Sequence, residues 1–497
     1  MKITSSKLDT SHLTANEEAL RRCQTALELK DKGSYEGARE AMGPLWTRVG
    51  ERPETGGLYP SVTAEVLLCV GVLTRWIGSK NQIKEAQFLS RDLISESITF
   101  YESVGDVTKI AAARAELAYC YWREGALDEA RIMFNEALQK LTTEGNTRAG
   151  ALLGLAVVEW SDSRFSESLR ILNENAFLFK KITNHTIKGT YHNQLANVLT
   201  NFATAEKRND YFQLAIDEYE KADDQFKRAH NVIFRADVKN NVGFLLYKLS
   251  RFKEAHGYLE QARRLRTLVR DKIGIAQIDD TLAQVLIAEK RFKEAETVAK
   301  RAVRVLDKSG HQCLLADALI THGIALARLQ QTERAQFTFQ RAIEVAHQVG
   351  ALNKAGLAAL TLIEELDELP PDTLYAAYDA SEWVVNSQSL EILRRLDRAA
   401  RRAVSTSRGQ PKARAVMEAI LNKPCSLHDE VSKYEASLIR QALTQANGSV
   451  TRAAKALRMT YQGLAYVIGS RHKDLLKERS PIRRRSRKAQ TDGPPNN

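Results

Sequence analysis

The pentapeptide RFKEA occurs at Arg251–Ala255 and again, 40 residues later, at Arg291–Ala295. Small residues recur around both copies with the same period. They form three series: Gly243, Ala283 and Gly323; Ala255, Ala295 and Ala335; and Ala262, Ala302 and Ala342. Because self-similarity at a fixed period of this length is the signature of repeat proteins, the sequence predicts stacked copies of one structural unit.

The pattern within each copy predicts a helical hairpin. A small residue in the first helix, Gly243, and another in the second, Ala255, allow the two helices to approach closely. Large residues such as Phe252 and Leu259 then fill the space between hairpins, and each hairpin needs a neighbour to cover its apolar surface. Only ten of the 497 residues are proline, which favours long helices over an all-β fold. The predicted fold class is all-α, a superhelical array of helical hairpins followed by a small C-terminal domain.

A small-large pattern is clearest in one further copy, at Leu117, Ala118, Tyr121, Gly125, Ala130, Phe134 and Ala137. It resembles the tetratricopeptide repeat family. The resemblance covers residues 18–366, about eight hairpins, and implies a binding scaffold without identifying what is bound. The 40-residue spacing exceeds the usual period of about 34 residues, so we expect longer helices or longer connections.

The resemblance also implies that the first helix of each hairpin lines the concave face. The residues that this mapping places on or near that face are Tyr119, Trp122, Trp160, Asn193, Asn197, Asn240, Phe244 and Tyr247. Aromatic rings and amides are suitable partners for peptides, so the hypothesis is a groove for a protein or peptide. The alternative is that about half of these side chains belong to the core or are merely exposed.

Charge is distributed unevenly along the chain. Residues 394–497 carry 23 Lys and Arg against 8 Asp and Glu, whereas residues 1–393 carry 50 against 53. This asymmetry predicts a polyanion-binding end joined to a near-neutral body, with a solubilising tail as the alternative. Between them, Leu369-Pro370-Pro371 is expected to end the array and residues 367–428 to form a helical connector and linker. Its basic segment Leu393–Val404 is predicted to be an amphipathic helix that either contacts DNA phosphates or faces solvent.

Residues 429–478 are predicted to form three short helices. The first, Lys433–Ala446, would end at the pair Asn447-Gly448, and Ser449 would cap a second helix that runs to Leu457. Thr460 would cap a third helix of about twelve residues. Inward positions are expected at Met459, Leu464, Val467 and Ile468, with Ala453 and Ala454 allowing the third helix to cross closely. Two helices joined by a tight turn at this spacing form a helix-turn-helix.

This segment resembles the Fis-type helix-turn-helix family of bacterial regulators. The residues that carry the resemblance are Gly448, Thr451, Arg452, Ala453, Ala454, Leu457, Met459 and Leu464. It implies that Thr460–Arg471 is the recognition helix. Three residues depart from the family pattern, Arg458, Tyr461 and Gly463, and they leave that helix with little charge before Arg471.

Residues implied or predicted to contact DNA come from this module and from the basic tail at residues 479–497. They are Arg452, Thr460, Tyr461, Gln462, Tyr466, Arg471, Lys473, Arg483, Arg484 and Arg485. Gln462 suits adenine edges, and a tyrosine can contact a thymine methyl group or a phosphate. The tail arginines would add affinity without sequence preference, because each neutralised phosphate releases counterions.

Other functional classes find no support in the sequence. It contains no phosphate-binding Gly-x-x-x-x-Gly-Lys-Ser/Thr loop, no His-Glu-x-x-His, no Gly-x-Ser-x-Gly and no Cys-x-x-Cys. We therefore expect no enzymatic activity, no cofactor and no metal. The five scattered cysteines favour a reducing cytoplasm. The polar residues 1–17 do not resemble a signal peptide, and no stretch of about 18 apolar residues suggests a membrane span.

Together these features predict a bacterial, cytoplasmic transcriptional regulator. Its array would bind a protein or peptide, its C-terminal module would engage duplex DNA, and two chains would form a homodimer. The alternative is an interaction scaffold whose degenerate helix-turn-helix serves dimerisation or nonspecific nucleic-acid contact. The DNA target, the partner and the choice between activation and repression are not predicted.

Overall fold

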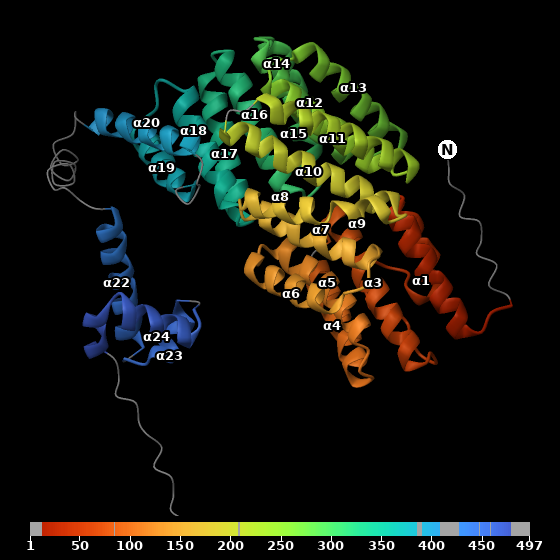
Figure 1. Ribbon diagram of the computed structural model, residues 1–497. Helices are drawn as coiled ribbons and strands as arrows, with labels where there is room; N and C mark the ends of the chain where they lie inside the picture. The colour runs from red at the N-terminus through yellow and green to blue at the C-terminus, as the bar shows by residue number, and fades with distance from the viewer. Residues whose placement is uncertain are drawn as a thin grey trace, which may run out of the picture. The chain divides into compact units, whose positions relative to one another are not determined.

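The computed structural model describes residues 12–83, 85–206, 209–384, 390–407, 427–446, 448–457 and 459–478. Within these ranges the secondary structure consists of helices, and no strand occurs. The chain divides into two compact units, Met1–Ala403 and Val404–Asn497, which are described separately here (Figure 1). The all-α prediction is confirmed.

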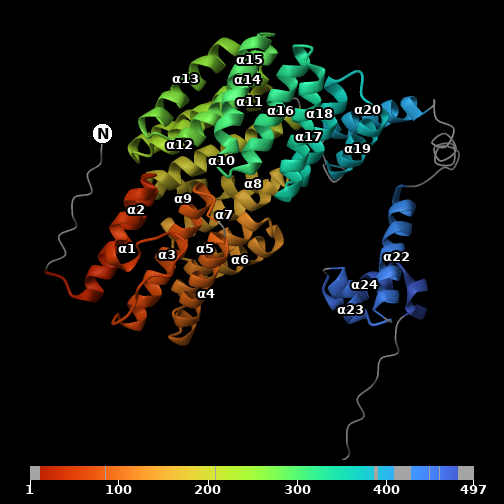
Figure 2. The same cartoon turned by 180° about the vertical axis from the view of Figure 1, so that it is seen from behind.

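The first unit is a series of helical hairpins. The paired helices are α1 (Ala15–Asp31) and α2 (Tyr35–Met42), α3 (Pro60–Lys80) and α4 (Ala86–Ser103), α5 (Val107–Glu124) and α6 (Leu127–Lys140), α7 (Asn146–Ser161) and α8 (Phe165–Glu174), α10 (His185–Glu206) and α11 (Asn209–Arg228), α12 (Val232–Lys248) and α13 (Phe252–Leu268), α14 (Lys272–Ala288) and α15 (Phe292–Asp307), and α16 (Gln312–Arg328) and α17 (Thr332–Gln348). A short 3-10 helix, Gly43–Leu45, follows α2, and a short helix, α9 (Ala176–Lys181), follows α8. This is a tetratricopeptide-like array (Figure 2).

The turns within the later hairpins and the connections between them alternate every 20 residues. The residues at this step all have positive φ, between 55° and 77°: His230, Ser250, Arg270, Lys290, Gly310, Gln330 and Gly350. A left-handed residue at this point ends one helix and turns the chain into the next. Each 40-residue period therefore consists of two helices of 16 or 17 residues joined by short connections. The longer helices expected from the sequence are present.

The small residues lie where two helices meet. The nine members of the three periodic series include Ala255, Ala295 and Ala335, which are all 0% exposed. A Cβ on Gly243 would lie 2.7 Å from Leu259 Cδ2, and one on Gly323 would lie 2.7 Å from Phe339 Cε1. Such distances are shorter than van der Waals contact, so the second helix packs directly on the backbone of the first, as predicted.

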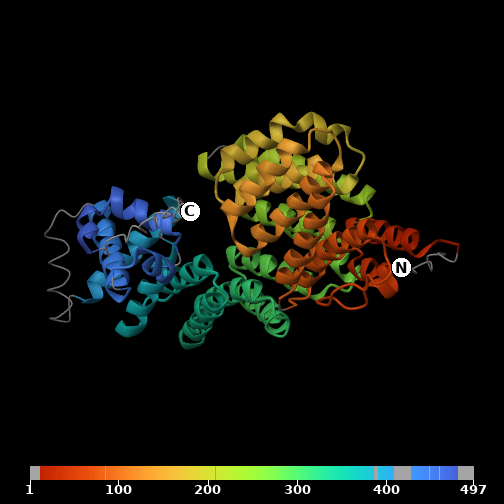
Figure 3. The same cartoon turned by 90° about the horizontal axis from the view of Figure 1, so that it is seen from below.

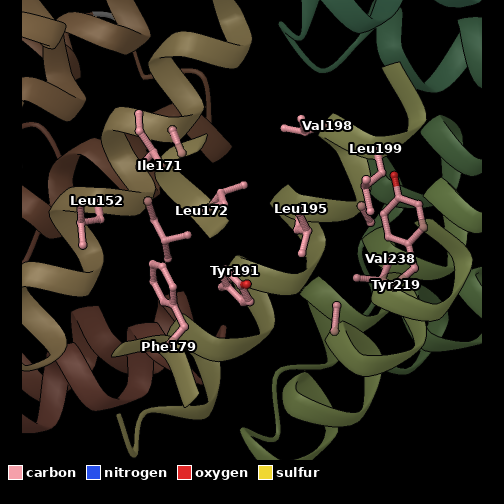
Figure 4. Packing of buried hydrophobic residues seen from close by; sticks show 14 of the residues in the cluster. Leu152, Ile171, Leu172, Phe179, Tyr191, Leu195, Val198, Leu199, Tyr219 and Val238 are labelled. Atoms are coloured by element: carbon pink, nitrogen blue, oxygen red, sulfur yellow. The ribbon is translucent and has the colours of Figure 1, made fainter. Parts of the chain in front are cut away.

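Apolar side chains connect one hairpin to the next without a break. Phe179 of α9 stacks on Tyr191 of α10, with ring centroids 4.3 Å apart and planes 18° apart. Figure 4 shows the two rings next to one another, with Leu172 above them and Leu195 beside Tyr191. Because each hairpin buries its apolar face against its neighbours, the stability of the array comes from nearest-neighbour contacts.

Helix α3 corrects one expectation from the sequence. By length and composition, α3 is the one described helix that is long and apolar enough to cross a membrane. No apolar stretch of that length was expected from the sequence. However, 72% of its most apolar window is buried inside the protein. It also carries Arg75, which is 3% exposed and pairs with Glu116 of α5 at 2.5 Å. A mostly buried helix of this composition is what the core of a repeat array requires.

The N-terminal hairpin contacts the middle of the array. The carbonyl oxygen of Asp31 accepts hydrogen bonds from Thr186 Oγ1 and Asn231 Nδ2, both at 2.9 Å, and its Oδ2 accepts one from Asn184 Nδ2 at 3.0 Å. Nearby, the rings of Trp76 and Phe234 lie 6.2 Å apart. We call this contact the seam. Figure 3 shows the N-terminal helices, in red, beside green helices from the middle of the array.

The array continues into the predicted connector. Helices α18 (Leu352–Glu365), α19 (Pro371–Ser381) and α20 (Leu390–Ser407) follow α17, with a 3-10 turn at Glu382–Val384. Arg402 of α20 donates to the carbonyl oxygens of Leu366 and Asp367, both at 2.5 Å. Arg395 pairs with Glu364 at 2.8 Å. Part of the basic face of α20 therefore caps the end of α18. From the sequence, this face was expected either to contact DNA phosphates or to face solvent, and a capping role was not included.

Candidate functional site

The C-terminal unit contains three helices around a small core. They are α22 (Leu427–Gln445), α23 (Val450–Ala456) and α24 (Tyr461–Ser470), followed by a 3-10 turn at Lys473–Glu478. Leu443, Ala453, Leu464, Ile468 and Leu475 are 0% exposed in this core. The small Ala453 and the adjacent Ala454, at 1%, let the helices cross closely, as predicted.

The turn between α22 and α23 has the expected cap. Gly448 has φ +74°, and its N–H donates to the carbonyl oxygen of Leu443 at 2.8 Å, which is the bond that closes a Schellman motif. Asn447, the other member of the predicted pair, lies outside the described residues. Ser449 occupies the N-cap position of α23 but makes no capping bond with its side chain.

The next turn differs from the prediction at Met459. Its side chain is 39% exposed, not inward. The core space is filled instead by Leu464 and by the partly buried Leu457. Met459 Cε lies 4.0 Å from the point where a Cβ on Gly463 would lie, so the methionine covers the start of α24 at the surface. Arg458 lies outside the described residues.

Helix α24 is the predicted recognition helix. Thr460 caps it, because its hydroxyl accepts a hydrogen bond from the Gly463 N–H at 3.0 Å. Gly463, one of the departures from the family pattern, has a local explanation, since a Cβ there would approach the Thr460 hydroxyl to 3.0 Å. Tyr461, Gln462 and Tyr466 all lie on this helix. Their side chains are not among those that the structure describes.

Exposed cationic side chains lie on α23 and just after the end of α24. Arg452 and Lys455 of α23 are exposed, and Arg471 and Lys473 follow α24 and are exposed too. Arg471 is not independent, because its Nη1 lies 3.6 Å from Glu435 Oε1 of α22. The remaining predicted contacts, Arg483, Arg484 and Arg485, lie outside the described residues.

Sequence reasoning missed a contact that fixes the end of α24. His472 is 4% exposed, and its Nε2 lies 2.7 Å from Glu435 Oε2. Glu435 therefore holds both His472 and Arg471 against the first helix of the module. Arg440 adds a second link to the same turn through Asp474 at 3.0 Å. No local pattern indicates these pairs, since each joins residues more than 30 positions apart.

The predicted groove residues of the array divide into pairs with different environments. Tyr119 and Trp122 are partly buried, and both have internal partners. The Tyr119 hydroxyl donates to the carbonyl oxygen of Gly150 at 2.8 Å, and Trp122 Nε1 donates to Ser161 Oγ at 2.9 Å. The pKa of Tyr119 is raised mainly by burial. The side chains of Tyr119 and Trp122 therefore connect the hairpin of α5 to that of α7, in addition to the predicted position on the groove.

The amides of α10 and α12 are also partly committed. Asn197 Oδ1 accepts a hydrogen bond from the hydroxyl of the buried Tyr219 at 2.7 Å, and Asn193 Oδ1 accepts one from Asn241 Nδ2 at 3.3 Å. Asn240 Oδ1 and Trp160 Nε1 are buried and have no hydrogen-bond partner among the described residues. An unpaired acceptor and an unpaired donor are features that a bound peptide backbone satisfies.

Phe244 and Tyr247 form the most accessible part of the predicted set. Phe244 is 37% exposed, and its ring lies 5.8 Å from that of Tyr247. Lys248 Nζ lies above both rings, at 5.2 Å and 5.5 Å from their centroids. Among the described residues, no group of three or more His, Cys, Asp or Glu side chains could hold a metal ion.

Comparison with known families bears on the C-terminal module. Residues 431–467 match the model of the bacterial regulatory protein, Fis family. The chain carries a Fis-type helix-turn-helix. The match covers α23, the first seven of the ten residues of α24 and most of α22, so the Fis-type module coincides with the three packed helices described above. No curated protein matches the sequence of this chain.

Solved structures similar to this chain are helical-repeat proteins. One is the apo form of the quorum sensor NprR from B. thuringiensis, at 13% identity, covering 68% of this chain and 90% of that one, with a TM-score of 0.47. A second is a Rap protein complexed with competence and sporulation factor, at 13% identity, 69% and 98% coverage and a TM-score of 0.46. A third is aspartyl phosphate phosphatase F from Bacillus subtilis, at 11% identity, 77% and 94% coverage and a TM-score of 0.43. The fold assignment rests on the hairpins of this chain.

Proposed function

We propose that this chain is a bacterial DNA-binding transcriptional regulator. The observation that supports this most strongly is the Fis-type helix-turn-helix at residues 431–467, with α24 capped by Thr460 and supported by α22 and α23. Helix-turn-helix proteins place the second helix of the motif in the major groove, with flanking residues on the phosphates. In this proposal α24 enters the groove, and Arg452, Arg471, Lys473 and the basic tail contact the backbone.

A mobility-shift titration of the full chain on duplex DNA tests this proposal. We expect binding that weakens steeply as salt rises, because phosphate contacts release counterions. A chain truncated after Ala403 is the control and should not bind. The change Arg452→Gln should weaken binding to all sequences by a similar factor, whereas Gln462→Ala should change sequence preference. Absence of binding by the full chain at low salt contradicts the proposal.

The array is proposed to bind a protein or peptide partner. Phe244 is the sharpest probe because it is exposed, whereas replacing Asn197 would leave the buried Tyr219 hydroxyl without its acceptor. Phe244→Ala should weaken partner binding without loss of helicity. The matched control is Phe337→Ala on α17, since Phe337 is 68% exposed on a second helix of a hairpin. Equal effects of the two changes would contradict a groove on the first helices.

A scaffold role is the second candidate, and one observation favours it. From Tyr461 to Ser470 the recognition helix contains no charged residue. A helix without Arg or Lys lacks the commonest specific base contact, the bidentate pair to guanine. Selection from a random DNA pool separates the two candidates, because an enriched motif supports regulation and an unenriched pool supports the scaffold. For either candidate function, we propose a cytoplasmic homodimer that carries out no catalytic step. Light scattering of the purified chain tests whether it is a dimer.

A further inference from the structure

Glu435, in the middle of α22, links that helix to the end of α24. Its Oε2 lies 2.7 Å from Nε2 of His472, and its Oε1 lies 3.6 Å from Nη1 of Arg471. His472 is 4% exposed, whereas Arg471 is exposed. A single carboxylate therefore uses one oxygen for a buried imidazole and directs the other toward an exposed guanidinium.

The bond to His472 holds the carboxylate of Glu435 in place. The main chain of His472 is fixed in turn, since its N–H donates to the carbonyl oxygen of Val467 at 3.3 Å and its carbonyl oxygen accepts from the Leu475 N–H at 3.0 Å. A side chain that is already held by a buried partner loses little further freedom when it makes a second contact. Oε1 of Glu435 is therefore a preorganised partner for Arg471.

Arg471 differs from the other cations of the module that the proposed function assigns to DNA. Among the side chains that the structure describes, Arg452 and Lys473 are exposed and form no ion pair. Arg471 is also the first cation after a recognition helix that has no charged residue from Tyr461 to Ser470. The carboxylate of Glu435 therefore lowers the positive charge at the end of the helix that is proposed to approach DNA.

The geometry of the pair allows Arg471 to change partners. The distance of 3.6 Å is longer than a normal hydrogen bond, and the Arg471 side chain is 63% exposed. An exposed ion pair of this kind is weak, whereas a phosphate can accept two parallel hydrogen bonds from a guanidinium. A phosphate can thus displace Glu435 from Arg471, while the bond to His472 keeps the carboxylate close by.

We propose that Glu435 competes with DNA phosphate for Arg471. Glu435 is a positioning residue in this proposal, because it acts on DNA through Arg471. The inference rests on the proposed DNA-binding function and adds a residue that limits it. The consequence is a lower affinity for every duplex, and a weaker dependence on salt, than the cations of the module alone would give, since phosphate contacts supply affinity without sequence preference.

The change Glu435→Gln in the full chain tests the proposal. Glutamine keeps an acceptor for the His472 N–H and removes the charge that attracts Arg471. On a duplex of random sequence we expect the affinity to rise about two- to fivefold, which is the range of an exposed ion pair. The plot of log affinity against log salt should become steeper by about one, because one more phosphate is contacted. A purely structural role of Glu435 predicts the opposite, weaker binding.

Two further variants separate the position of the charge from its amount. Asp474→Asn removes the same charge from the same module, where Asp474 pairs with Arg440 at 3.0 Å, and should leave the salt dependence unchanged. The double variant Glu435→Gln, Arg471→Gln should bind no more tightly than Arg471→Gln alone. An equal gain from Asp474→Asn, or a gain that survives in the double variant, would show that net charge is the cause and would overturn the proposal.

A comparison of two single variants does not depend on the folding of Glu435→Gln. Because Arg471 must leave Glu435 to reach a phosphate, Arg471→Gln should weaken binding less than Arg452→Gln does. An equal or larger loss overturns the proposal. In all these outcomes the natural chain binds DNA, so the proposed function stands. If neither the natural chain nor any variant binds DNA at low salt, the proposed function fails and this inference fails with it.

Discussion

Asp280 shows how a single buried charge can lower the stability of the array. This α14 residue is 9% exposed, and its Oδ2 accepts a hydrogen bond from Gln284 Nε2 at 3.1 Å. Burial, and to a smaller extent the nearby Asp317, raise the pKa of Asp280 to about 6. Thr321 and Lys354 act in the opposite direction but do not compensate. The folded protein therefore favours the protonated form more strongly than the unfolded chain does.

Asp280→Asn should stabilise the protein near neutral pH. Because the folded pKa lies above the unfolded value of about 3.9, the stability that Asp280 contributes is present below pH ~4 and is lost as pH rises through 6. At pH 7.5 we expect the variant to gain on the order of 1–3 kcal/mol, and at pH 4 we expect no difference. Urea unfolding at both pH values measures this. The same gain at both would show that charge is not the cause.

The hydrogen-bond partners of single side chains could not be predicted from the sequence. Tyr119 and Asn197 were correctly placed on first helices because their phase in the repeat is a local property. Their hydrogen-bond partners, Gly150 and Tyr219, lie 31 and 22 residues away, and no spacing rule predicts them. Whether an aromatic or an amide is already satisfied, or is available to a ligand, therefore depends on the assembled fold.

At the scale of the elements, the left-handed turn residues of the array offer a direct test. Lys290, in the turn between α14 and α15, has φ +63° and is exposed, whereas Gly350, in the connection between α17 and α18, has φ +71°. A side chain in this conformation costs roughly 1–2 kcal/mol, and glycine avoids that cost. Both residues are left-handed, so each position carries the same requirement on φ.

Lys290→Gly should therefore stabilise the array by about 1 kcal/mol, and Gly350→Ala should destabilise it by a similar amount. A Cβ at Gly350 would meet nothing within 4 Å, so the second change tests backbone strain alone. Thermal unfolding followed by circular dichroism measures both. Two shifts of the same sign would contradict the explanation.

The cap of α24 matters for the stability of the DNA-binding module. Thr460→Ala removes the acceptor of the Gly463 N–H and should cost about 1 kcal/mol. Thr460→Ser keeps the hydroxyl and is the matched control. We expect hydrogen exchange in α24 to accelerate in the alanine variant only. An equal acceleration in both variants would show that the methyl group, not the cap, supports the helix.

At the scale of the whole molecule, the sequence predicted the repeat and the C-terminal module because both depend on residues close together in the chain. The RFKEA copies, the small residues and Gly448 act within one hairpin or one turn. The seam could not be predicted in this way, because it joins Asp31 to Asn231 across 200 residues. Its position depends on the summed rotation of all intervening hairpins, to which each repeat adds a small angle.

The seam should control how far the first unit can open. Asn231 is 0% exposed and has two roles, since its Oδ1 caps α12 through the Phe234 N–H at 3.0 Å while its Nδ2 donates to Asp31. Asn231→Ser keeps a capping oxygen and removes the donor to Asp31. Thr186→Val removes the other donor to the same carbonyl without changing the size of the side chain.

We expect the double variant Asn231→Ser, Thr186→Val to lose about 2 kcal/mol at the seam, since each hydrogen bond contributes about 1 kcal/mol. Helices α1 and α2 should then exchange amide hydrogens about 30-fold faster, while α14 to α17 stay unchanged. Small-angle scattering should show a larger radius of gyration. Asp106→Ser, which alters the cap of α5 away from the seam, is the control. If exchange and radius are the same in both variants, contacts between neighbouring hairpins alone hold the superhelix closed.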